Sequence, residues 1–148
     1  MFLRRLELPG YVLEYDSWIE TDVYRHKATG VKIWSNVVDV SFGAIEKACI
    51  LHYTTNIGAS NITNAAKSSA EIWTSLKPEN ALFGFGIYGS VKSPGAFGSR
   101  ETILRNNYRA QINDNPAILV DWADRVNYCI PIVAAVSGVY VKGHKSGI

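Results

Sequence analysis

The 148-residue sequence has little of several features that would place it in a specialised class of protein. Its two cysteines, Cys49 and Cys129, each lie in an apolar run, which is typical of reduced, buried thiols and not of a disulfide framework. No stretch reaches the about 20 apolar residues that a membrane-spanning helix needs, and the first seven residues contain no signal-peptide core. Ligand spacings typical of a metal site are also missing. We therefore expect a cytoplasmic protein with neither a membrane segment nor a metal centre.

Charge of one sign is also scarce. Fifteen Lys and Arg stand against thirteen Asp and Glu, which gives a net charge of +2, and the longest run of like charge is the pair Arg4–Arg5. A field this weak does not attract a polyanion, so nucleic acid is not an expected partner. What the chain does have is apolar and aromatic content: 47% of residues are hydrophobic, including four Trp, eight Tyr and five Phe. This composition excludes disorder and predicts a chain that buries a core.

Strand patterns dominate the first third of the chain. Short alternating or β-branched runs at 11–15, 19–24 and 31–34 are separated by turn-forming residues and predict a small antiparallel meander. A continuous apolar run at 48–53 is too short for a helix and predicts a strand that is buried on both faces.

Helical spacing appears twice in the remainder. Apolar residues recur every three or four positions from Asn64 to Leu76, and Pro78 closes that stretch. Ser99 is expected to cap a second helix that runs to about Ile112, with Arg100 on its solvated face.

The last part of the sequence reads as strands again. Two apolar runs at 127–133 and 136–141 predict two strands, and Pro131 predicts an edge position or a bulge in the first of them.

Three features stand out as candidates for chemistry. His52 lies in the middle of the buried strand, the glycines of Phe83–Tyr88 punctuate a second strand, and Asn127 opens a third. Each has an ordinary structural explanation by itself: a core histidine, relief of crowding, and a polar strand end. Taken together and in this order, Leu51-His52-Tyr53-Thr54-Thr55 and Phe83-Gly84-Phe85-Gly86-Ile87-Tyr88 resemble the ADP-ribosyltransferase superfamily. The resemblance is to the branch of the poly(ADP-ribose) polymerases, diphtheria toxin and many bacterial polymorphic toxins.

The resemblance covers about residues 46–148 and implies an α+β fold. Its centre would be an ADP-ribosyltransferase-like split antiparallel sheet with flanking helices, preceded by the small N-terminal meander. The implied domains are 1–40 and 41–148. The implied activity is transfer of ADP-ribose from NAD, as substrate, to a macromolecular acceptor that is expected to be a protein, with release of nicotinamide.

The resemblance also implies roles for individual residues. His52 would bond a ribose hydroxyl of NAD, the backbone of Tyr53 would hold the carboxamide, and the ring of Tyr88 would pack on nicotinamide. The remaining NAD-binding candidates are Thr54, Gly84, Gly86, Ser90 and Ser93, and Phe97 is the nearest ring for the second face of nicotinamide. Such a site must hold the dinucleotide in a strained pose, because cleavage passes through an oxocarbenium-like state.

Asn127 is where the sequence departs from the family pattern. Chain-elongating members have a Glu at the corresponding place, and Asn can bond a hydroxyl but supplies no charge. Three alternatives remain: a mono-ADP-ribosyltransferase, an NAD hydrolase, and a catalytically impaired module that binds NAD or ADP-ribose. The nearest other carboxylates are Glu101, a favourable charge in the first turn of its helix, and Asp124, a surface charge beside Arg125. A purely structural domain without a nucleotide is the further alternative.

The N-terminal segment has a second resemblance, to a WW module, through Leu8-Pro9-Gly10-Tyr11, Val23-Tyr24-Arg25-His26 and Thr29-Gly30-Val31-Lys32-Ile33-Trp34. It implies a proline-rich peptide as partner. The sequence departs from the module at three places. Tyr11 stands where the first Trp is usual, Val23 stands where one wall of the proline groove is normally aromatic, and no proline follows Trp34. The alternative is a meander that packs on the sheet of the transferase-like part.

Overall fold

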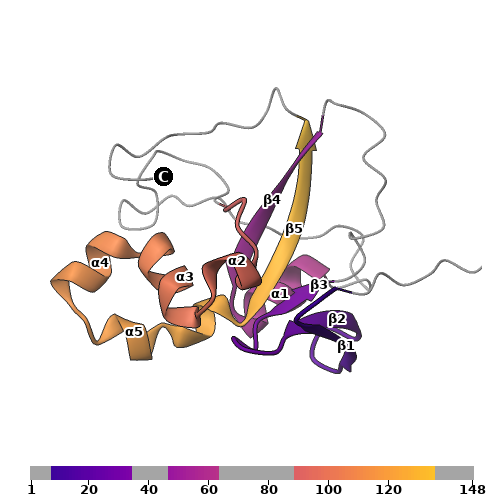
Figure 1. Cartoon of the computed structure of the whole chain (residues 1–148), viewed down its shortest axis with the longest axis horizontal. Helices are drawn as coiled ribbons and strands as arrows, with labels where there is room; N and C mark the ends of the chain where they lie inside the picture. Colours follow the sequence, from indigo (N-terminus) through magenta and orange to yellow (C-terminus); the bar gives the residue numbers. More distant parts are fainter. Residues whose placement is uncertain (1–7, 35–46, 64–88, 136–148) are drawn as a thin grey trace, which may run out of the picture.

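The computed structural model describes residues 8–34, 47–63 and 89–135 (Figure 1). The strands are β1 (Tyr11–Asp16), β2 (Thr21–His26), β3 (Lys32–Trp34), β4 (Lys47–Thr54) and β5 (Tyr128–Ala135). The helices are α1 (Asn56–Thr63), α2 (Pro94–Phe97), α3 (Arg100–Asn107), α4 (Arg109–Asp114), α5 (Ile118–Asp121) and the 3₁₀ helix η2 (Ala123–Val126).

The strands form one five-stranded sheet in the order β1-β2-β3-β5-β4. The predicted meander is present as β1–β3, and its third strand lies beside β5. The β3–β5 pair is parallel whereas the other pairs are antiparallel, so the sheet is mixed and not antiparallel throughout as expected. A mixed sheet with several short helices is an α+β architecture.

Each face of the sheet packs against helices and has its own hydrophobic cluster. The register aligns Tyr24, Ile33, Cys129 and Tyr53 in one row across four strands, and this row packs with residues of α2–α5 and η2. The opposite face carries Val23, Tyr128 and Ile130, which pack with Ala59 of α1. Figure 1 shows α3, α4 and α5 together on one side of the long β4–β5 pair. Because strand side chains alternate between faces, the register decides which helix each side chain meets.

Two helices differ from the sequence predictions. Helix α1 begins at Asn56, directly after β4, where the sequence indicated no helix; the side chain of Thr55 accepts a hydrogen bond from Gly58 N at 3.1 Å and satisfies one donor of its first turn. The helix predicted from Ser99 to Ile112 is divided at Tyr108 into α3 and α4, whereas the expected cap is confirmed: Ser99 Oγ accepts from Thr102 N at 3.1 Å.

Pro131 lies in β5 beyond the point at which the described pairing with β3 ends, and the β4–β5 register is continuous, so the expected bulge is absent. Its partner Leu51 exchanges both backbone hydrogen bonds with Ser90 on the other side of β4. The Leu51–Pro131 pair is therefore a non-hydrogen-bonded pair, in which the missing proline N–H faces away from β4. The described pairing of β5 with β3 ends at Cys129, so the proline removes no hydrogen bond of that described ladder either.

Some sequence predictions fall on residues outside the described part of the chain. These are the helix at 64–76, the strand at 83–88, the last strand at 136–141 and the domain boundary near residue 40. Within the described residues, Cys129 is buried and carries a free thiol, as predicted. In the same residues, no helix has both the length and the apolarity to cross a membrane.

Candidate functional site

The strand that contains His52 lies between two other parts of the chain that the sequence selected, Ser90 and the strand after Asn127, whereas Phe83–Tyr88 lies outside the described residues. Leu51 of β4 pairs with Ser90 through two backbone hydrogen bonds, Leu51 N to Ser90 O at 2.7 Å and Ser90 N to Leu51 O at 2.9 Å. On its other side β4 pairs with β5 along its whole length. The strand that contains His52 is therefore flanked by the segment at Ser90 and by the strand that follows Asn127.

His52 and Thr54 share the α1 face of the sheet. His52 lies opposite Ile130, and Thr54 lies opposite Tyr128. In the same cross-strand row Lys32 of β3 lies on the other side of Tyr128. Thr54 packs under α1, since a Cβ added to Gly58 would lie 2.0 Å from its Oγ1.

Tyr53 belongs to the opposite face. Its ring packs edge-on against Phe97 with centroids 5.9 Å apart, and its hydroxyl donates to Lys92 O at 2.8 Å. Burial, with a smaller contribution from Cys129, raises the pKa of this phenol far above its usual value. Its peptide N–H and C=O point away from β5, because Tyr53 has the same strand parity as Leu51. The backbone groups predicted to hold a carboxamide thus face the side of β4 on which Ser90 lies.

The other predicted NAD-binding residues have separate surroundings. Ser90 Oγ accepts from Lys92 N at 3.1 Å, and Ser93 Oγ accepts from Ala96 N at 3.2 Å and caps α2. Phe97 is buried in the cluster under the helices. Tyr88, Gly84 and Gly86 lie outside the described residues.

Asn127 is held at both ends of its amide group. Its Oδ1 accepts from a guanidinium nitrogen of Arg100, and its Nδ2 donates to Asn56 Oδ1 at 2.8 Å. Its backbone oxygen accepts from Lys32 N at 3.0 Å, which fixes the place where β5 starts beside β3. Three segments far apart in the sequence therefore converge on this one residue, two on its side chain and one on its backbone.

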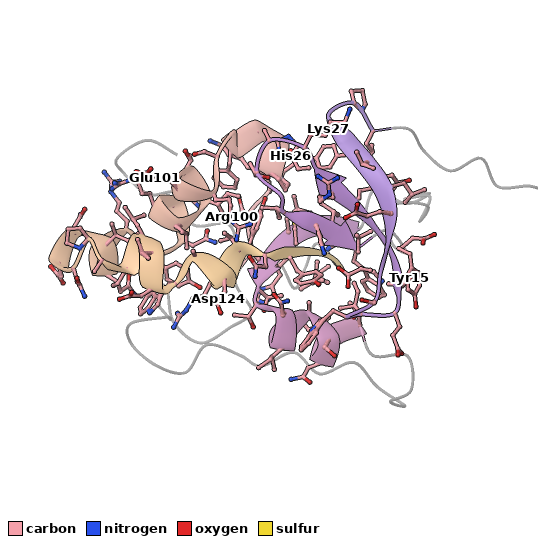
Figure 2. The ribbon with its side chains drawn as sticks, turned by 90° about the horizontal axis from the view of Figure 1, so that it is seen from below. Tyr15, His26, Lys27, Arg100, Glu101 and Asp124 are labelled. Carbon is pink, nitrogen blue, oxygen red and sulfur yellow. The ribbon has the colours of Figure 1, made fainter. Side chains whose placement is uncertain are left out.

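Arg100 is partly buried and hydrogen-bonded across the fold, contrary to the expectation of a solvated face. Figure 2 shows it between the helices and the sheet, whereas Tyr15 lies at the outer edge. Besides Asn127, its guanidinium donates to Thr29 O at 3.3 Å and to Ala123 O at 2.8 Å. Helical spacing correctly predicted that Arg100 lies on α3. Its bond to Thr29 O in the β2–β3 turn could not be predicted, because it depends on how α3 packs against that turn. Burial lowers the pKa of Arg100, and the nearby Asp124 partly offsets this effect.

A small open pocket of about 140 Å³ lies beside this network on the α1 side, where β3 and β5 begin. Its lining residues are Gly30, Lys32, Asn56, Asn127 and Tyr128. The pocket therefore combines one predicted site residue, Asn127, with four that the sequence reasoning did not select. NAD is much larger than this volume, so the pocket accommodates only a fragment of a dinucleotide.

Asp16 bonds two of the residues that line the pocket, Lys32 and Tyr128. Its Oδ2 accepts from Lys32 Nζ and from the hydroxyl of Tyr128, both at 2.8 Å, and its Oδ1 accepts from the backbone N–H groups of Trp18 and Ile19. Burial by itself raises the pKa of Asp16, but these hydrogen bonds outweigh burial and hold the pKa below its ordinary value. The Tyr128 phenol is affected in the opposite sense, because burial and then the bond to Asp16 raise its pKa.

The two alternative carboxylates do not enter the pocket. Glu101 pairs with Arg105 at 2.8 Å along the exposed side of α3, as expected for a charge in the first turn of a helix. Asp124 lies in η2 and is exposed. In the described part of the chain, no group of three or more His, Cys, Asp or Glu side chains is arranged to hold a metal ion.

The sequence contained weak signals for the missed residues. Asp16 ends an apolar strand at a turn, and Lys32 alternates with Val31 and Ile33, so each was readable as an ordinary polar position. Their proximity depends on a turn and on the parallel pairing of β3 with β5, and neither can be deduced from local spacing.

The chain was also compared with known proteins. A protein-family model described as "Domain of unknown function (DUF8279)" matches residues 9–101, which is more than half of the 148 residues. The chain belongs to the DUF8279 family. No curated protein and no solved structure matches it. The DUF8279 match begins before β1 and ends at the second residue of α3, so the meander, β4 and α1 fall within one family unit.

Proposed function

We propose that this member of the DUF8279 family transfers ADP-ribose from NAD to a macromolecular acceptor, expected to be a protein, and releases nicotinamide. The observation that supports the proposal most directly is that β4, which contains His52, is flanked by Ser90 on one side and by β5, which follows Asn127, on the other. A site for NAD needs residues from separate parts of the chain in one place, and this adjacency supports such a site.

In the proposed reaction, His52 bonds a ribose hydroxyl and the outward-facing peptide groups of Tyr53 hold the carboxamide of nicotinamide. The bond between nicotinamide and ribose breaks with its electron pair leaving on the nicotinamide nitrogen, and an acceptor nucleophile forms the new bond at the ribose carbon. Tyr88 is proposed to pack on the nicotinamide ring; its position lies outside the described residues.

The test is an assay of nicotinamide release from NAD by the purified chain, with and without a mixture of candidate acceptor proteins. Wild type is expected to release nicotinamide, and His52→Ala is expected to lose at least tenfold in rate while keeping its melting temperature within a few degrees. Asn113→Ala, on the exposed surface of α4, is the matched control and is expected to retain the wild-type rate. Equal rates in His52→Ala and wild type would contradict the proposal.

A second candidate function is a module that binds NAD or ADP-ribose without turnover, and the contacts of Asn127 favour it. The catalytic Glu expected at this place would stabilise a developing positive charge, but a carboxylate here would face the guanidinium of Arg100. Asn127→Glu by itself would therefore form an ion pair with Arg100. The double variant Asn127→Glu/Arg100→Gln is the sharper test, because its carboxylate is free of that cation. A gain of nicotinamide release in the double variant identifies an impaired transferase; NAD binding without any gain identifies a binding module.

A further inference from the structure

We propose that the pocket lined by Gly30, Lys32, Asn56, Asn127 and Tyr128 is a subsite for a phosphate or diphosphate group. The inference goes beyond the proposed transfer reaction. It concerns the hydrogen-bonding groups that line the pocket, and it is valid whether or not the protein cleaves NAD.

The orientation of two amide groups follows from a donor-only residue. Arginine has N–H donors and no acceptor, so the end of Asn127 that faces Arg100 must be its oxygen. The Nδ2 of Asn127 then points to Asn56 and requires the oxygen of Asn56 there, at 2.8 Å. This in turn leaves the Nδ2 of Asn56 as the outward end of the pair. Arg100 thereby orients both amides so that their remaining groups are hydrogen-bond donors.

Lys32 adds a charged donor to the same pocket. Its ammonium has three N–H groups, of which Asp16 accepts one, and its side chain is 32% exposed whereas that of Asp16 is 2% exposed. Both oxygens of that carboxylate are occupied by donors, and Asp16 is not among the residues that line the pocket. Lys32 is thus the charged residue in the lining, beside the amide groups of Asn56 and Asn127. The hydroxyl hydrogen of Tyr128 is used in the bond to Asp16, so Tyr128 offers no further donor.

The size and shape of the pocket agree with a small anion. A volume of about 140 Å³ is below the about 300 Å³ at which pockets begin to enclose drug-sized ligands. Gly30 lines one side with no atom within 4 Å of the position of an added Cβ, so the approach there is unobstructed. A group of a few atoms that accepts several hydrogen bonds fits this pocket, whereas a ribose hydroxyl that must donate finds no matching acceptor from Asn127.

The experiment is calorimetric titration of the full chain with inorganic pyrophosphate, ADP-ribose and nicotinamide as separate probes. Asn127→Asp is the informative variant, because it keeps the volume and the contact with Arg100 but replaces the Nδ2 donor by a carboxylate oxygen. We expect this variant to bind pyrophosphate at least tenfold more weakly than wild type. Asn113→Asp makes the same charge change on the exposed surface of α4 and is expected to bind within twofold of wild type.

The two phosphate sources are separated by competition. If ADP-ribose displaces pyrophosphate, and if Asn127→Asp also binds ADP-ribose more weakly than wild type does, the subsite takes the diphosphate of a nucleotide. If pyrophosphate binds and ADP-ribose does not compete with it, the subsite takes free phosphate. Either result supports a phosphate subsite. The proposal is overturned if wild type binds no pyrophosphate, or if both Asn→Asp variants weaken binding equally.

Lys32→Gln is the second variant and is expected to weaken pyrophosphate binding at least fivefold. Melting curves check that each variant is folded. If the wild-type chain binds pyrophosphate but releases no nicotinamide from NAD, the proposed transfer reaction is refuted and the phosphate subsite is not.

Discussion

Replacement of Asp16 tests the polar network that bonds Lys32 and Tyr128 of the pocket. Asp16 as a whole residue is 4% exposed, and its carboxylate accepts four hydrogen bonds, two from side chains and two from the backbone. In Asp16→Asn the remaining oxygen can still accept from Trp18 N and Ile19 N. The new NH₂ group, however, would face two donors, the ammonium of Lys32 and the hydroxyl of Tyr128. The variant therefore loses both side-chain bonds at almost unchanged volume.

The magnitude follows from the two lost bonds. Hydrogen bonds to a charged group contribute about 1.5–3 kcal/mol each, and breaking a buried ion pair costs about 3–5 kcal/mol. Lys32 is one-third exposed and regains part of its hydration, which places the expected loss in the free energy of unfolding at about 3 kcal/mol. For a chain of this size, that corresponds to a fall in melting temperature of roughly 6–12 °C.

The loss must also depend on pH, with a definite sign. The folded-state pKa of Asp16 lies below its ordinary value of 3.8, so the folded protein binds this proton more weakly than the unfolded chain. The contribution of Asp16 is therefore fully present above that ordinary value and is lost as the pH falls through the lower, folded-state pKa. The difference in free energy of unfolding between wild type and Asp16→Asn should be largest above about pH 5 and shrink below pH 4.

The measurement is urea unfolding monitored by tryptophan fluorescence at a series of pH values. Asp114→Asn, at an exposed position of α4, is the matched control and is expected to leave the midpoint nearly unchanged. Equal losses in the two variants, or a loss in Asp16→Asn that is the same at pH 3 and pH 7, would refute the assignment of the network.

Three further predictions concern the segment after residue 88 and its contacts with β4. Gly98 has φ +80° at the end of α2, so Gly98→Ala should lower the free energy of unfolding by about 1–2 kcal/mol and Gly98→Asn by less; equal losses would contradict the left-handed backbone. An added Cβ at Gly89 would lie 3.1 Å from Leu51 O, so Gly89→Ala should cost about 1–3 kcal/mol in thermal unfolding, and an unchanged melting temperature would argue against the contact with β4. Tyr53→Phe removes the bond to Lys92 O and should cost about 1 kcal/mol. Because the pKa of Tyr53 is raised, wild type should lose stability above about pH 10 more steeply than this variant, which equilibrium unfolding at pH 8 and pH 11 would check.

Local patterns in the sequence predicted the elements that depend on local chemistry. The three strands of the meander, β4, the start of β5 and the cap at Ser99 follow from alternation, apolar runs and capping preference, which involve neighbouring residues only. Helix α1 was missed because its eight residues carry a weak apolar pattern, and it is held by packing of Ala59 against β5 residues. The ADP-ribosyltransferase resemblance selected His52 and Asn127; His52 lies opposite Ile130 of β5, and Asn127 directly precedes β5.

The sequence by itself thus determined the strands, one helix cap and the polar residues worth testing. The tertiary structure decided which of those residues meet. Arg100 turns inward because α3 packs beside the β2–β3 turn, and Lys32 reaches the site because β3 runs parallel to β5. The pairing of distant strands is set by burial across the whole sheet, and local spacing carries no information about it. For this reason the candidate pocket, with Asp16 bonded to Lys32 and Tyr128 and Arg100 bonded to Asn127, became visible only in the folded chain.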